Sequence, residues 1–108
     1  MTTISIFRDS EQIDTLPIKK QFYINENPEG ELYWYESIED APYRTGVFQI
    51  WLQSIGYNPK IFLVPPNWQL IIDDVWMEKK AYFNLENLKG KKIELRYKEY
   101  RFVFQIDE

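Results

Sequence analysis

Two features of the sequence predict an α+β domain in which one helix packs on a mainly antiparallel sheet. Near both ends of the chain apolar and polar residues alternate, and a period of two is typical of a strand with one buried face. In the middle, apolar residues recur instead at helical spacing. An all-β barrel is the alternative if the central segment is itself a strand.

The clearest β-hairpin signal lies at the C-terminus. Residues 93–97 and 100–106 each alternate, and Lys98 and Glu99 fall between the two runs. Two alternating runs with a short break are typical of a hairpin. We expect its inward side chains to form part of the core: Ile93, Leu95, Phe102, Phe104 and Ile106.

A second hairpin is expected over residues 21–35, preceded by a strand over residues 3–7. Aromatic and β-branched residues at 21–24 and 32–35 flank a segment rich in Asn, Pro and Gly, which are residues that turns favour. Pro17 separates this hairpin from the first strand.

The helix is expected over about residues 42–55. Asp40 is suited to cap its start and Gly56 to end it. Its apolar stripe follows the spacing i, i+3, i+4 and i+7: Phe48, Trp51, Leu52 and Ile55. A buried strand over residues 47–52 competes with this interpretation, because only Gln49 interrupts the apolar run.

Residues 60–64 and 68–72 are short apolar runs that we interpret as strands. Residues 73–88 fit either a helix that begins at residues 73–74 or a hairpin that turns at residues 78–80. The hairpin is favoured because Val, Trp, Tyr and Phe prefer strands.

Three tryptophans are expected in or beside the core: Trp51, Trp68 and Trp76.

The chain has 108 residues, of which 44% are hydrophobic and 18% aromatic. This length and composition predict one folded domain over residues 1–108. No apolar run reaches the length of a membrane-spanning helix, and the N-terminus lacks the features of a signal peptide. We therefore expect a cytoplasmic protein without membrane contact.

Cysteine and histidine are both missing from the sequence. Their absence excludes disulfides, thiol nucleophiles, imidazole bases and the usual zinc ligands. We therefore expect no catalytic residues, no metal ion and no cofactor, and a protein that is not an enzyme. The enzymatic alternative is a carboxylate or metal-dependent site at Asp73, Asp74 and Glu78, since carboxylate oxygens hold magnesium.

Charge is unevenly distributed along the sequence, although the formal net charge is only −4. Residues 1–78 contain twelve acidic and five basic residues, whereas residues 79–108 contain five acidic and eight basic ones. The net charges of these two parts are therefore −7 and +3. An acidic total disfavours general binding to nucleic acids or membranes.

Residues 25–40 form the candidate partner-binding segment, because they contain six acidic residues and no basic one. In a strand, Leu32 and Trp34 would point inward and Tyr33 and Tyr35 outward. Tyrosines provide contact area and carboxylates steer association. We therefore expect an interaction module of the inhibitor or adaptor type that binds a basic protein. A solvated acidic hairpin whose tyrosines cover the sheet is the plainer interpretation. The expected contact residues are Glu26, Glu29, Glu31, Tyr33, Tyr35, Glu36, Glu39 and Asp40.

The alternative function is nucleic-acid binding through the C-terminal hairpin. Basic side chains can contact phosphates while an exposed tyrosine stacks on an unpaired base. The expected residues are Lys91, Lys92, Arg96, Lys98 and Arg101. Glu94 and Glu99 dilute this charge, and charged residues on strands more often serve solubility.

Overall fold

The structure is a computed structural model that describes residues 2–43, 46–52, 61–63, 67–77 and 82–106. In these residues the chain consists mainly of strands: β1 (Thr2–Arg8), β2 (Glu11–Ile18), β3 (Gln21–Glu26), β4 (Leu32–Tyr35), β5 (Val47–Trp51), β6 (Ile61–Leu63), β7 (Gln69–Ile72), β8 (Val75–Trp76), β9 (Tyr82–Asn84), β10 (Lys92–Tyr97) and β11 (Tyr100–Gln105). The helical elements of this part are two short 3-10 turns, η1 (Ile38–Asp40) and η2 (Leu85–Asn87). Among the described residues, no helix has the length and apolar character that a membrane crossing needs.

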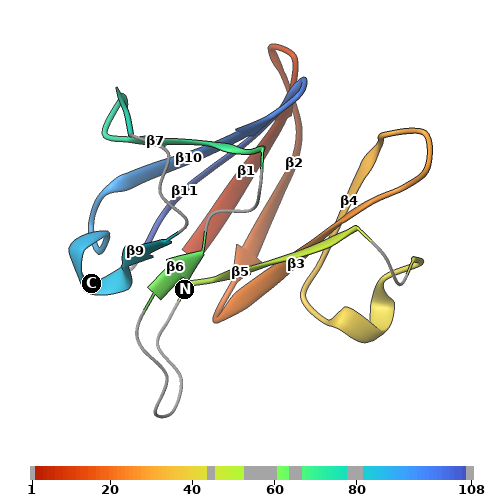
Figure 1. The fold of residues 1–108 in the computed structure, drawn as a ribbon, viewed down its shortest axis with the longest axis horizontal. Coiled ribbons are helices and arrows are strands. Elements are labelled where there is room, and N and C mark those ends of the chain that lie inside the picture. Colours follow the sequence, from red (N-terminus) through yellow and green to blue (C-terminus); the bar gives the residue numbers. More distant parts are fainter. Residues whose placement is uncertain (1, 44–45, 53–60, 64–66, 78–81, 107–108) are drawn as a thin grey trace.

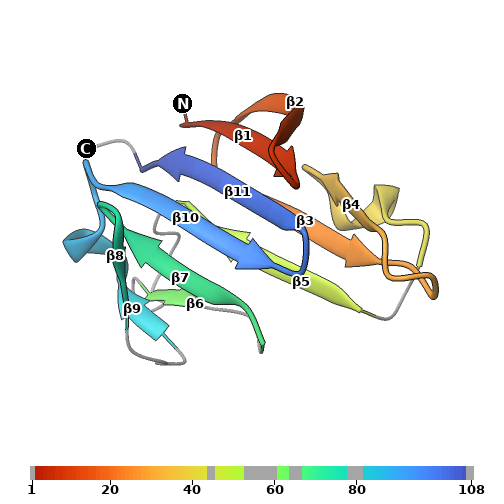
Figure 2. The ribbon, with the colours of Figure 1, turned by 90° about the horizontal axis from the view of Figure 1, so that it is seen from above.

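The strands form three antiparallel sheets (Figure 1). The largest has six strands in the order β2-β1-β11-β10-β7-β8, the second has three in the order β4-β3-β5, and β6 pairs with β9. Because β1 pairs with β11, segments from opposite ends of the sequence lie side by side in the largest sheet. In Figure 2, β3 and β5 run in a layer beneath β10 and β11.

The core lies between the six-stranded and three-stranded sheets. Alternation sends every second side chain of a strand to the same side, and β1, β10 and β11 bury these residues: Ile4, Ile6, Ile93, Leu95, Phe102 and Phe104. β3 and β5 supply apolar side chains from the opposite layer: Phe22, Ile24 and Ile50. The ring of Phe102 lies 6.2, 5.9 and 5.5 Å from those of Phe22, Trp34 and Trp68. This aromatic cluster joins the two sheets.

Both predicted hairpins are confirmed, as β3–β4 and β10–β11. All five side chains expected inside the C-terminal hairpin are buried. Its turn holds Lys98 at a φ of 54°, in the left-handed region, and Gly30 takes a φ of 85° in the other turn. A Cβ atom at Gly30 would lie 3.3 Å from Lys98 Nζ, so the two turns lie close together.

The predicted helix over residues 42–55 is wrong. Residues 47–51 form β5, which pairs with β3, and residues 44–45 and 53–55 lie outside the described residues. Three residues pack on the core at a period of two: Phe48, Ile50 and Leu52. Val47 and Trp51 hide this repeat, because they place apolar residues on the other, half-buried face as well. The described fold is therefore all β, and its strands form open sheets rather than the closed barrel considered as the alternative.

The strands expected at residues 3–7, 60–64 and 68–72 are present as β1, β6 and β7, with residues 60 and 64 outside the described residues. β2 is a strand that the sequence pattern does not predict. β2 lies at one edge of the six-stranded sheet, and most of its residues are exposed. Pro17 is tolerated there, because one side of an edge strand needs no ladder hydrogen bonds.

The hairpin favoured for residues 73–88 is also wrong. β8 pairs with β7 through a turn at residues 73–74, whose φ angles are 48° and 67°, while β9 pairs with β6. Residues 78–81 lie outside the described residues. Trp76 follows this turn and is 55% exposed, so it does not belong to the core, unlike Trp68, which is 4% exposed.

Replacing Phe102 with alanine is expected to lower the free energy of unfolding by about 3 to 5 kcal/mol, because a cavity would open between the two sheets. Urea unfolding measures this loss. Ile13→Ala is the control: Ile13 is 42% exposed, and its truncation should change the free energy of unfolding by less than about 0.5 kcal/mol. A loss no larger than that of the control would contradict the role given to Phe102.

Candidate functional site

The side chains of β4 point to the two sides that the alternation predicts. Leu32 is buried, and Trp34 packs against the core, where its Nε1 donates to Asp14 Oδ2 at 2.6 Å. Tyr33 is 39% exposed, and Tyr35 is half-buried. The two phenol rings therefore lie on the outer face of the β4-β3-β5 sheet.

A third tyrosine, Tyr43, lies close to this pair. The fully buried Asn25 of β3 accepts a hydrogen bond from the backbone N–H of Tyr43 at 3.1 Å and donates one to the carbonyl of Gly46 at 3.5 Å. These bonds hold the chain that follows η1 against β3. The sequence analysis assigns residues 42–55 to a helix and therefore does not identify Tyr43 as a neighbour of Tyr33 and Tyr35. The one signal in the sequence is the polar residue Asn25 near the end of an apolar strand.

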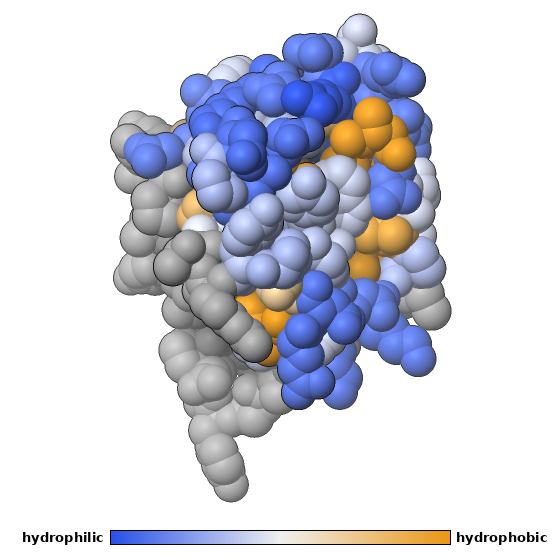
Figure 3. Space-filling model, turned by 90° about the vertical axis from the view of Figure 1, so that its right-hand side faces the viewer, coloured by the Kyte–Doolittle hydropathy of each residue, from blue (hydrophilic) through white to orange (hydrophobic). Residues whose placement is uncertain are grey.

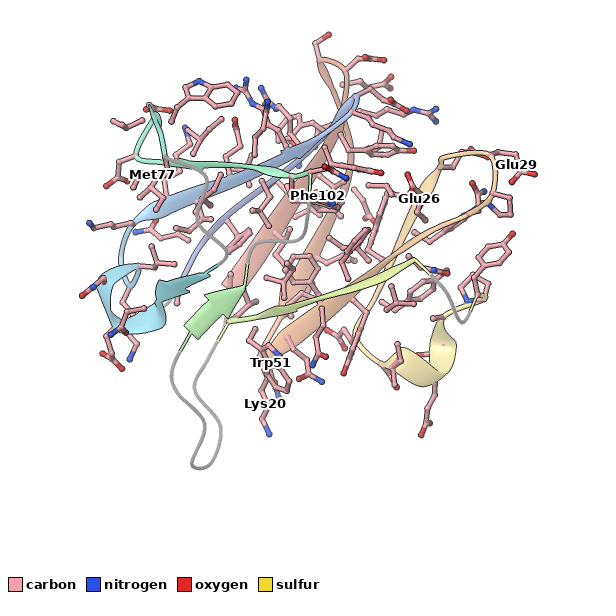
Figure 4. All side chains as sticks on the ribbon, in the orientation of Figure 1. Lys20, Glu26, Glu29, Trp51, Met77 and Phe102 are labelled. Carbon is pink, nitrogen blue, oxygen red and sulfur yellow. The ribbon has the colours of Figure 1, made fainter. Side chains whose placement is uncertain are left out.

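Five exposed acidic residues belong to the same segment, and none of them forms an ion pair with another described residue: Glu29, Glu31, Glu36, Glu39 and Asp40. Together with Tyr33, Tyr35 and Tyr43 they form what we call the acidic tyrosine face. Figure 3 views this side of the molecule and shows residues of intermediate hydropathy among strongly hydrophilic ones, with a few hydrophobic residues exposed beside them. Glu29 lies at the tip of the β3–β4 hairpin (Figure 4).

Burial raises the pKa of Tyr35 above its ordinary value, and the neighbouring Tyr33, Tyr43 and Asp40 raise it further. The phenol of Tyr35 therefore stays protonated at neutral pH and remains a hydrogen-bond donor. The face thus combines phenol donors with carboxylate acceptors.

Glu26 does not belong to this face, although it is among the expected contact residues. Its carboxylate accepts hydrogen bonds from Tyr97 Oη at 2.9 Å and from Lys98 Nζ at 2.8 Å. The hydrogen bond from Lys98 lowers the pKa of Glu26 against the opposing effect of burial, and Tyr97 adds to the lowering. Glu26 therefore links β3 to the C-terminal hairpin.

The basic residues of the alternative function do not form one free patch. Most of them contact acidic side chains instead. Lys92 pairs with Asp74, Arg96 and Arg101 lie against Glu94, and Lys98 pairs with Glu26: their N···O distances are 3.0 Å for Lys92, 3.9 Å for Arg101 and 2.8 Å for Lys98. Lys91 is exposed, and none of the ion pairs among the described residues involves it.

The carboxylates of the enzymatic alternative have structural roles where they are described. Asp73 Oδ1 accepts a hydrogen bond from the backbone N–H of Lys92 at 2.9 Å, and Asp74 pairs with the ammonium group of the same lysine. Glu78 lies outside the described residues. In the part of the chain that the structure describes, no three acidic side chains come together as metal ligands.

Glu26→Gln is expected to lower stability at neutral pH and to have less effect in acid. The folded-state pKa of Glu26 is lowered, so its ionised form contributes stability above the ordinary glutamate pKa of about 4.3, and this contribution is lost as the pH falls through the folded-state value. The urea midpoints of wild type and variant should therefore differ at neutral pH and converge as the pH falls through the folded-state pKa of Glu26. Glu31→Gln, at an exposed carboxylate without an ion pair among the described residues, should lower the urea midpoint at neutral pH much less than Glu26→Gln. A gap that stays constant with pH would contradict this role of Glu26.

Comparison of the chain with protein-family models, with curated proteins and with solved structures finds no match. The function has to be inferred from the chemistry of the surface itself.

Proposed function

We propose that this protein is a non-enzymatic interaction module, of the inhibitor or adaptor type, that binds a basic protein through the acidic tyrosine face. The observation that carries this proposal is the set of five exposed carboxylates without an ion pair among the described residues, gathered beside three tyrosines. Clustered like charges repel one another, and a basic partner would relieve that repulsion.

A protein interface needs contact area as well as complementary charge, and the tyrosines supply that area. A tyrosine has few rotatable bonds, so burying its ring at an interface costs little conformational entropy. Tyr33 is already 39% exposed. Phenol rings also attract guanidinium and ammonium groups through their π-faces, which favours arginine and lysine in the partner.

The backbone of the face is held in place before any partner binds. Asn27 Oδ1 accepts from the N–H of Glu31 at 2.8 Å, and the N–H of Asn27 donates to the carbonyl of Glu31 at 2.9 Å. Ser37 Oγ accepts from the N–H of Glu39 at 3.3 Å and caps η1. Together with the bonds of Asn25, these contacts reduce the ordering cost of association.

Affinity capture from the organism that encodes the chain, followed by binding measurements with the purified partner, tests this proposal. We expect a basic protein whose affinity falls about tenfold or more with Tyr33→Ala, since exposed aromatic residues at interfaces are frequent hot spots. Glu36→Lys should also weaken binding, and its effect should shrink as salt is added.

Glu11→Lys is the matched control. Glu11 is exposed like Glu36 and makes no ion pair among the described residues, but it lies on β2, outside the face. This variant should keep the affinity within about twofold. A partner bound equally well by wild type, Tyr33→Ala and Glu36→Lys would exclude the acidic tyrosine face as the binding surface.

A further inference from the structure

The outer face of the six-stranded sheet carries two arginines directly opposite each other. Arg96 of β10 and Arg101 of β11 are partners in the strand register, and both point away from the core because their neighbours Leu95 and Phe102 are buried. Like charges in directly opposite positions normally destabilise a sheet. A local conflict of this kind is expected mainly at functional sites.

One carboxylate and two aromatic rings hold the arginines. Glu94, only 7% exposed, accepts a hydrogen bond from Arg96 Nε, and Arg101 Nε lies 3.9 Å from its other oxygen. The guanidinium carbon of Arg96 lies 5.5 Å from the centroid of the Trp76 ring, and that of Arg101 lies 4.7 Å from the Phe7 ring. Contacts on both sides restrict the planar guanidinium groups and so fix their orientation.

The terminal amino groups of both arginines remain available. In the described part of the chain, the polar contacts of Arg96 and Arg101 all run from Nε to Glu94. Arg101 Nε is itself buried and makes no hydrogen bond there. Two cations against one carboxylate leave a net positive charge and unused donors, a combination that suits an oxyanion with several acceptor oxygens.

Trp76 adds an aromatic surface beside this pair of cations. It is 55% exposed although Arg96 lies against its ring. Exposed aromatic rings next to basic side chains on a sheet are how proteins stack nucleobases while they bind the phosphates. We propose that Arg96 and Arg101 bind the phosphate of a nucleotide and that Trp76 stacks on its base.

This site is independent of the acidic tyrosine face, because the two surfaces lie on different sheets. The nucleotide is either free or part of a single strand, and both present the same phosphate and base. Glu94 lies beside both arginines and disfavours a second phosphate, so a single nucleotide unit is the ligand that suits the site.

Nuclear magnetic resonance titration with adenosine monophosphate tests the proposal on the intact chain. The arginine Nε–H and tryptophan indole N–H signals should shift in a saturable way, with a Kd of roughly 0.1 to 1 mM because Trp76 and both arginines stay partly open to solvent. Arg96→Lys should weaken binding about tenfold, since lysine keeps the charge but loses the fork of donors. Trp76→Ala should reduce the affinity to that of inorganic phosphate, and adenosine without a phosphate should give no saturable shift.

Lys91→Gln is the matched control. Lys91 is exposed and lies just before β10, and its substitution changes the net charge by one unit without altering the site. It should bind as wild type does. A short single-stranded oligonucleotide that binds more tightly than the mononucleotide would identify a strand as the source. No saturable shift, an unchanged affinity in Arg96→Lys, or an equal loss in Lys91→Gln would overturn the proposal.

Discussion

The packing of Phe102 between the two larger sheets is the contact on which the other features of the molecule depend. Its ring meets Phe22 from β3, Trp34 from β4 and Trp68, which precedes β7. A domain of this length buries a limited core, so each sheet commits one face to it. The opposite faces are thereby left for other chemistry, and the acidic tyrosine face and the arginine pair occupy outer faces of different sheets.

The charge asymmetry of the sequence is not reproduced as two charged poles in space. Several cations of the basic C-terminal part contact acids: Lys92 meets Asp74, Lys98 meets Glu26, and Glu94 lies between two arginines. The acids from the β3–β4 turn to η1 have no such partners among the described residues. The two sets therefore differ in whether their members contact opposite charges, although Glu94 offsets only one of its two arginines. The sequence does not reveal this difference because it depends on contacts between distant segments.

Local pattern predicts the two hairpins, whose strands are neighbours in sequence and alternate clearly, and it also predicts β1, β6 and β7. β5 defeats the same reasoning because one of its faces packs on the core while half-buried Val47 and Trp51 keep the other face apolar as well. β8 is too short for a periodic signal, and its role depends on pairing with β7. The outward direction of Tyr33 follows from the alternation of β4, whereas the contribution of Tyr43 depends on a hydrogen bond to Asn25 that no local pattern contains.

The β3–β4 hairpin offers an internal comparison that bears on why its acids stay unpaired. Glu26, at the start of the turn, accepts a hydrogen bond from Lys98 of the neighbouring turn, and this contact lowers the pKa of Glu26. Gly30 approaches the same lysine, so a cation is within reach of the hairpin tip. Glu29 and Glu31 nevertheless have no ion pair among the described residues, and both are exposed. Lys98 is a single cation and is already paired with Glu26. The other carboxylates of the hairpin therefore keep their charge, which fits the proposal that a basic partner supplies the cations that bind them.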